Sequence, residues 1–212
     1  MNTLSFARPR AVTEGSAPPS LSGVLAASLE RAQEVRIPFR HLRFEHLLPP
    51  AHIATLHALS LPPATAVIGE ACGCVAVRRA LGSIDRAAAV SRTLAHGFAA
   101  ETVADQIVRR AGVEVADCRL ALTLTQEVDG WACEPRTGEG EARYRFVVGL
   151  SPMHQIDLGP DLYRGPQTWA TQLPWRPGSA FGFAPAADTW HGFEPRLIRR
   201  LRATLVIDYV AG

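Results

Sequence analysis

His191, Arg202 and Thr204 lie close together near the C-terminus, and their side chains could bind a metal ion or a small acid. A histidine nitrogen is a common neutral metal ligand. Arg202 and Thr204 share one face of the strand predicted over residues 201–209, because side chains alternate along a strand. A buried arginine needs an anion, and a small carboxylate accepts hydrogen bonds from both groups. The trio indicates an acid-binding pocket, although His191 alone is better explained as a hydrogen-bonded turn residue.

Other residues that often carry chemistry form no recognised motif. Cys72 and Cys74 are separated by one residue, which is a poor spacing for a zinc site built from cysteine pairs. We interpret the cysteines as buried apolar residues in a reducing compartment. The arginine-rich segment 196–202 favours a solvated turn over a surface for an acidic or phosphate-bearing partner. The histidines of the N-terminal third are interpreted as surface or packing residues: His41, His46, His52 and His57.

Helical periodicity dominates the first half of the chain. Apolar residues recur at helical spacing in three segments, which predict helices over residues 20–35, 51–59 and 87–110. A short strand is expected near residues 39–44. Gly97 is a candidate interruption of the third helix, and Gly112 suits its end.

The second half of the chain follows a period of two. Strands are predicted in the segments CRLALTLTQEV, RYRFVVGLS, FGF, WHGF and RATLVIDYV. The segment GEGEAR between two of these strands is predicted to form a hairpin turn. Helices followed by strands predict an α+β fold, with helices packed on a pair of antiparallel sheets.

Length and composition favour a globular protein. The 212 residues suit one domain over residues 20–212, preceded by a flexible leader over residues 1–19. Apolar residues make up 47% of the chain, and the net charge of +2 is too small to indicate nucleic acid or an anionic membrane. No apolar run is long enough for a membrane span, and the N-terminus lacks the apolar core of a secretory signal. We therefore expect a cytoplasmic protein.

The C-terminal segment TWHGFEP followed by RAT resembles the iron(II)/2-oxoglutarate-dependent oxygenases. In that family the distal metal histidine sits in a similar segment, and an arginine about ten residues later binds the far carboxylate of 2-oxoglutarate. The resemblance extends to the segments PFRHLRFEHLLPPAHIATL, LTLTQEVDGWACEPRTG, RFVVGLS and DLGPDLY. It implies a double-stranded β-helix (jelly-roll) core preceded by helices. It also implies that His191 is a metal ligand and that Arg202 and Thr204 bind the co-substrate.

The chain departs from this family at the first pair of metal ligands. The family places His-x-Asp or His-x-Glu near the start of the sheet, whereas the matching stretch here is Pro135-Arg136-Thr137-Gly138. Arg136 and Gly138 therefore replace a histidine and a carboxylate. A cation at position 136 opposes metal binding. Candidate substitutes lie nearby in the sequence: Glu134, Cys133, Glu139, His154 and Asp157.

Three functions follow from the resemblance and from this departure. An active protein would be a hydroxylase that uses Fe(II) and 2-oxoglutarate as cofactor and co-substrate. A catalytically inactive pseudo-oxygenase would use the pocket to bind a small acid or a partner protein, with no metal. A structural or scaffolding domain would bind no ligand. The sequence identifies no substrate, and we expect neither nucleic acid nor membrane as a partner.

Overall fold

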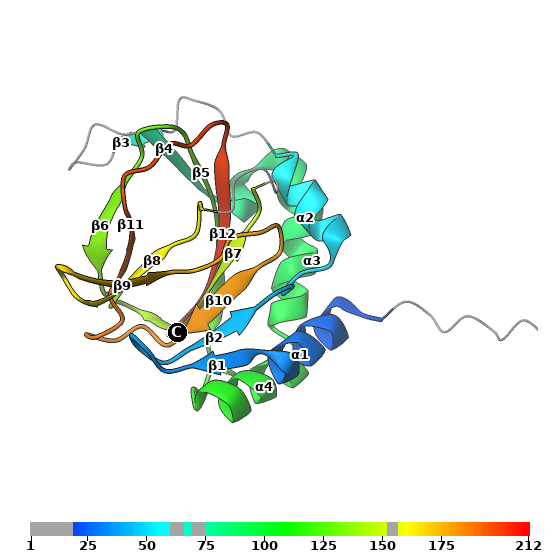
Figure 1. Ribbon diagram of the computed structural model, residues 1–212. Helices are drawn as coiled ribbons and strands as arrows, with labels where there is room; N and C mark the ends of the chain where they lie inside the picture. The colour runs from blue at the N-terminus through cyan, green and yellow to red at the C-terminus, as the bar shows by residue number, and fades with distance from the viewer. Residues whose placement is uncertain (1–18, 60–65, 69–74, 152–156) are drawn as a thin grey trace, which may run out of the picture.

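The computed structural model describes residues 19–59, 66–68, 75–151 and 157–212 (Figure 1). Within these ranges the chain forms two antiparallel sheets and four α-helices. Residues 1–18 of the expected leader, Cys72, Cys74 and His154 lie outside the described residues. None of the helices in these ranges is long and apolar enough to cross a bilayer.

The larger sheet has eight strands and the smaller has four. In spatial order the larger sheet contains β1 (Gln33–Val35), β2 (His41–Phe44), β10 (Ala180–Phe183), β7 (Ala142–Gly149), β12 (Arg202–Val210), β5 (Arg119–Glu127), β4 (Val75–Ala80) and β3 (Ala66–Ile68). The smaller sheet contains β6 (Cys133–Arg136), β11 (His191–Phe193), β8 (Asp161–Gly165) and β9 (Thr168–Gln172). The two facing sheets make a double-stranded β-helix, so the predicted α+β jelly roll is confirmed.

The helices cover the face of the larger sheet that points away from the smaller sheet (Figure 1). They are α1 (Leu21–Arg31), α2 (Pro50–His57), α3 (Ala88–Phe98) and α4 (Glu101–Ala111). Apolar side chains from both layers, such as Leu94, Phe98, Phe146 and Leu205, form the main core. A second apolar cluster, which includes Phe181, Phe183 and Leu162, fills part of the space between the sheets.

Strand β12 is the central element that positions the site. It pairs with β5 on one side and with β7 on the other, along almost its whole length. One face packs in the main core through Ala203, Leu205, Ile207 and Tyr209. The other face lines a pocket between the sheets through Arg202, Thr204, Val206 and Asp208. This alternation is the one that the sequence predicts.

Two helix predictions were wrong in their boundaries. The first helix ends at Arg31, and residues 33–35 form β1 instead of a further turn. The predicted helix over residues 87–110 is two helices, because Ala100 is extended and α4 begins at Glu101. Gly97 lies inside α3, where an added Cβ would come within 2.7 Å of Leu21, so its lack of a side chain lets α1 approach closely.

Candidate functional site

The candidate site is a pocket of about 150 Å³ between the two sheets. Its walls come from β4, β5, β7, β10 and β12 of the larger sheet and from β6 and β11 of the smaller sheet. The structure brings His191, Arg202 and Thr204 together in this pocket, as the sequence indicates. It adds Arg78, Arg145, Glu127 and Asp208, which the sequence alone did not single out.

His191 is the first residue of β11, and its ring faces the pocket. Its Nδ1 lies 2.9 Å from the carbonyl oxygen of Thr189. A carbonyl can only accept a hydrogen bond, so Nδ1 carries the proton and Nε2 keeps its lone pair. Burial lowers the pKa of His191, the hydrogen bond to Thr189 opposes this shift, and the nearby cations Arg136 and Arg145 add to it, so that the pKa is about 4. The imidazole is therefore neutral at pH 7.

Arg136 stands directly opposite His191, because the two residues are Cα partners in the β6–β11 pair. Its side chain lines the pocket but forms no ion pair or hydrogen bond with another described residue. Residue Arg136 is exposed overall, so water solvates part of the guanidinium. A cation thus occupies the edge where the resemblance expects the first metal ligand.

Gly138 leaves no room for a carboxylate beside this histidine. A Cβ at position 138 would lie 2.8 Å from Cε1 of His191 and 3.0 Å from Nη1 of Arg145. The backbone there has a φ of +71°, in the left-handed region that disfavours other residues. Restoring an acid at this position would therefore require movement of the histidine ring as well as backbone strain.

Arg202 is buried, and its anion comes from the protein itself. Its Nη1 donates to Oε2 of Glu127 at 2.9 Å, and its Nε donates to the carbonyl of Leu158 at 2.8 Å. Glu127 and Arg202 are Cα partners on β5 and β12, and only 2% and 5% of their side chains is exposed. Burial raises the pKa of Glu127, and the adjacent guanidinium opposes that rise. The Glu127 carboxylate therefore occupies the place beside Arg202 where the sequence analysis expected the carboxylate of a ligand.

Aromatic rings complete the surroundings of Arg202. Its guanidinium carbon lies 4.4 Å from the ring centroid of Phe193, 5.2 Å from that of Trp131 and 5.4 Å from that of Trp175. Such rings stabilise a cation through their negative faces.

Glu127 could have been found from the sequence. It alternates with Thr123 and Thr125 on the same face of β5, the strand that pairs with β12.

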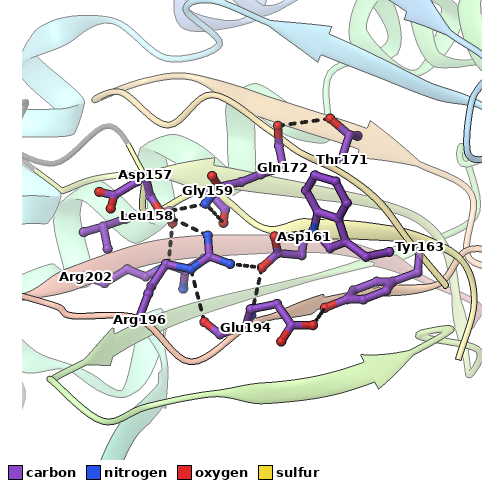
Figure 2. A network of polar contacts seen from close by, with 11 residues as sticks. Asp157, Leu158, Gly159, Asp161, Tyr163, Thr171, Gln172, Glu194, Arg196 and Arg202 are labelled. Atoms are coloured by element: carbon purple, nitrogen blue, oxygen red, sulfur yellow. Dashed lines mark hydrogen bonds and ion pairs between the residues drawn. The ribbon is translucent and has the colours of Figure 1, made fainter. Parts of the chain in front are cut away.

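A network of polar contacts holds the segment between β11 and β12 against β8 (Figure 2). The Arg196 guanidinium forms an ion pair with the buried carboxylate of Asp161, which also accepts from the backbone N–H of Glu194. Tyr163 donates to the Glu194 carboxylate at 2.5 Å. Arg196 is therefore a structural residue, and the reading of its segment as a solvated turn was wrong at this position. Arg199 and Arg200 are exposed.

The opposite end of the β12 face carries a second ion pair. Arg145 donates to Asp208 through Nε at 2.6 Å and through Nη2 at 3.1 Å. This two-point geometry neutralises Asp208, and the pair is about four-fifths buried. The hydroxyl of Thr204, between the two pairs, makes no hydrogen bond with another described residue.

The described residues do not fit iron(II). A facial site needs two histidines and a carboxylate, and no group of three histidine, cysteine or acidic side chains in the described ranges could hold a metal ion. Of the candidate substitutes, Cys133 lines the pocket, whereas Glu134 does not and is exposed. Glu139 and Asp157 are also exposed and lie outside the pocket lining.

The charges of the pocket favour an anion. Its described lining carries Arg78, Arg136, Arg145 and Arg202, against the two carboxylates Glu127 and Asp208. The carboxylates are bound to Arg202 and Arg145, so no carboxylate of the described lining is left to form an ion pair with Arg78 or Arg136. Because His191 is neutral, the described lining of the pocket carries a net positive charge.

Solved structures with a similar fold include 2-oxoglutarate/iron(II) oxygenases. A prolyl-4-hydroxylase from Pseudomonas putida matches with a TM-score of 0.55 and 12% identity, over 92% of this chain and 100% of that one. An oxidoreductase of the 2OG-Fe(II) oxygenase family from Burkholderia pseudomallei matches with a TM-score of 0.56 and 11% identity, over 93% of each chain.

Two further structures with a similar fold contain bound small molecules. The epimerase SnoN from nogalamycin biosynthesis is similar to this chain at 14% identity, with a TM-score of 0.51 over 88% of this chain and 82% of its own, in a complex with Fe³⁺ and α-ketoglutarate. EctD from S. alaskensis, also 14% identical with a TM-score of 0.54 over 96% of this chain and 82% of its own, was determined with 2-oxoglutarate. No known family profile and no curated protein matches the sequence. At these identities the likeness shows that the chain has the fold of the 2-oxoglutarate/iron(II) oxygenases.

Proposed function

We propose that this protein is a pseudo-oxygenase that binds a small organic acid without iron. The observation that carries the proposal is the pair formed by Arg136 and His191, in which an unpaired guanidinium faces a neutral imidazole. A guanidinium in this place provides a permanent positive charge where the fold otherwise uses a metal ion. It attracts an acid directly, and metal loading is not required.

The groups that remain free define the class of acid. Arg136 and Arg78 supply positive charge, and the Thr204 hydroxyl can donate a hydrogen bond. Nε2 of His191 can only accept, because the proton lies on Nδ1. A ligand that satisfies all of them carries a carboxylate and also a hydroxyl or N–H donor. The pocket volume of about 150 Å³ restricts it to a small molecule, such as a short hydroxy acid.

Arg202 contributes little to this affinity in our proposal. Its guanidinium already has a carboxylate and a carbonyl as partners, and both Arg202 and Glu127 are buried. A second acid would have to displace Glu127 and leave that carboxylate buried and unpaired, which is costly. This distinguishes the proposal from the binding of 2-oxoglutarate through the equivalent arginine.

The rival function is hydroxylation with Fe(II) and 2-oxoglutarate. It is supported by the fold and by the small molecules bound in SnoN and EctD. It would need metal ligands from outside the described residues, such as His154. A structural role without any ligand is the third possibility, and it predicts no binding of acids.

Calorimetric titration under anaerobic conditions separates the three functions. Malate, a four-carbon hydroxy acid, serves as the probe, with EDTA present and then with Fe(II) in place of the chelator. We expect malate to bind equally in both conditions, and Arg136→Gln to weaken binding by about tenfold, the equivalent of one charged hydrogen bond. The control Arg36→Gln, at an exposed ion pair, should leave the affinity unchanged.

Two results would overturn the proposal. Stoichiometric Fe(II) binding that tightens the binding of 2-oxoglutarate would support the hydroxylase. Absence of heat from malate, 2-oxoglutarate and Fe(II) alike would support a structural role.

A further inference from the structure

A second cavity, of about 670 Å³, lies between the end of α1, strand β2 and the segment of residues 173–180 that leads into β10. It shares no lining residue with the pocket around His191. Trp175 forms part of the wall of this second cavity and has the Arg202 guanidinium 5.4 Å from its ring. The two spaces are therefore neighbours with separate linings.

Three arginines from separate parts of the chain line this second cavity. Arg31 is in the last turn of α1, Arg43 is on β2 and Arg176 follows β9. None of the three forms an ion pair or side-chain hydrogen bond with another described residue. Glu45 is the only acidic residue among the described lining, so positive charge is in excess.

Some arginines of the described ranges have an acidic partner within the protein. Ion pairs in the described ranges engage seven of them: Arg36, Arg40, Arg119, Arg143, Arg145, Arg196 and Arg202. Like charges around one cavity repel each other, and this repulsion is relieved when an anion enters. Three arginines around one cavity therefore favour an anionic ligand there.

The floor of the second cavity combines apolar surface with buried polar groups. Phe44, Leu173 and Trp175 are buried apolar side chains in its lining. The indole N–H of Trp175 makes no hydrogen bond with another described residue, but it is fully enclosed and does not open onto the cavity. The lining suits a molecule with an aromatic body and an anionic head.

We propose that this cavity binds a small aryl phosphate, that is, an aromatic ring that carries a phosphate dianion. The phosphate would accept hydrogen bonds from the guanidinium groups, which match its geometry. The ring would lie against the apolar lining formed by Phe44, Leu173 and Trp175. This inference does not depend on the small-acid function proposed above, because the linings are separate.

Titration calorimetry with 1-naphthyl phosphate tests the proposal, with 1-naphthol and inorganic phosphate as separate probes. We expect one molecule of 1-naphthyl phosphate to bind per protein chain. We expect 1-naphthol and inorganic phosphate each to bind at least about tenfold more weakly. Arg31→Gln and Arg176→Gln should each weaken binding by about tenfold and leave folding intact, because both residues are exposed. Arg36→Gln is the matched control, since its side chain is 83% exposed and lies outside the lining.

The variants also separate this site from the pocket around His191. Binding of the aryl phosphate that survives Arg136→Gln supports the second cavity. The proposal is overturned if the wild-type protein does not bind 1-naphthyl phosphate, if inorganic phosphate binds equally well, or if Arg36→Gln weakens binding as much as Arg176→Gln does. Loss of binding on Arg136→Gln alone would assign the ligand to the other pocket.

Discussion

The arginines at the two ends of the pocket between the sheets differ in burial and in ion pairing. At one end Arg202 is enclosed by aromatic rings and neutralised by Glu127. At the other end Arg136 lies at the rim opposite His191 and has no ion-pair partner among the described residues. A buried ion pair contributes to the folded state and is closed to ligands, whereas an unpaired guanidinium at the rim contributes little to folding and remains free to bind. The difference predicts which substitutions change stability and which change binding.

The largest effect should follow removal of the Glu127 carboxylate. Glu127→Ala leaves a buried guanidinium without its anion, so we expect the free energy of unfolding to fall by about 3–5 kcal/mol. Chemical denaturation measures this loss. Added formate should restore part of it, because a small carboxylate that binds the native state stabilises that state.

The control for this substitution is Glu134→Ala, which removes an exposed carboxylate outside the pocket. Its effect should stay within about 0.5 kcal/mol. Equal losses from the two substitutions would contradict the contrast between the two ends.

Acidification should destabilise the protein through His191. Its folded-state pKa of about 4 lies below the unfolded value of 6.5, so the folded state binds fewer protons between these pH values. The stabilisation is complete above pH 6.5 and is lost as the pH falls towards 4, with a maximum of about 3 kcal/mol. Burial lowers the pKa of His41 as well, and that shift acts in the same direction.

Urea denaturation at pH 7 and at pH 4.5 measures this effect. Carboxylates also titrate in this range, so the informative quantity is the difference between the wild type and His191→Asn. The variant should lose less stability on acidification than the wild type does. An identical loss in both proteins would show that His191 is not protected from protonation.

Rebuilding the acid of the missing metal motif should destabilise the rim. We expect Gly138→Asp to cost about 1–3 kcal/mol, because its Cβ would approach the His191 ring and because φ is positive there. Gly140→Asp is the matched control, since no atom lies within 4 Å of a Cβ at position 140. Thermal unfolding of the two variants compares them directly. A neutral Gly138→Asp would mean that the ring moves easily.

The smallest effect on stability is expected at the unpaired arginine. Arg136→Gln should change the free energy of unfolding by less than about 0.5 kcal/mol, because no ion pair is lost. The same change should raise the pKa of His191, since the charge of Arg136 helps to lower it. Nuclear magnetic resonance titration of the histidine ring measures this pKa. A large loss of stability would place Arg136 with Arg202 as a structural residue.

The strands were easier to predict from the sequence than the ends of the helices. Alternation along β12 assigns its two faces correctly, because one face is apolar and the other carries Arg202 and Thr204. The first helix stops at Arg31, although the apolar pattern continues. Arg110 of α4 donates to the carbonyls of Glu30 and Ala32, and a contact between residues eighty positions apart has no local signal.

The pocket could be predicted only in part, because it also depends on contacts between residues far apart in the sequence. The sequence places His191, Arg202 and Thr204 on strands that converge, and it places Arg136 and Gly138 where metal ligands were expected. Which anion meets Arg202 depends on the register between β5 and β12, which puts Glu127 directly opposite. That register is a property of the assembled sheet.

The sequence by itself determined the alternation of apolar and polar residues, and with it the α+β class and the residues of β12 that share a face with Arg202 and Thr204. Periodicity is local, so a single strand reveals which side chains share a face. Only the tertiary structure decided that Glu127 neutralises Arg202 while Arg136 remains unpaired. Ion pairing depends on distances of a few ångströms between strands far apart in the chain, and these distances exist only after the sheets have formed.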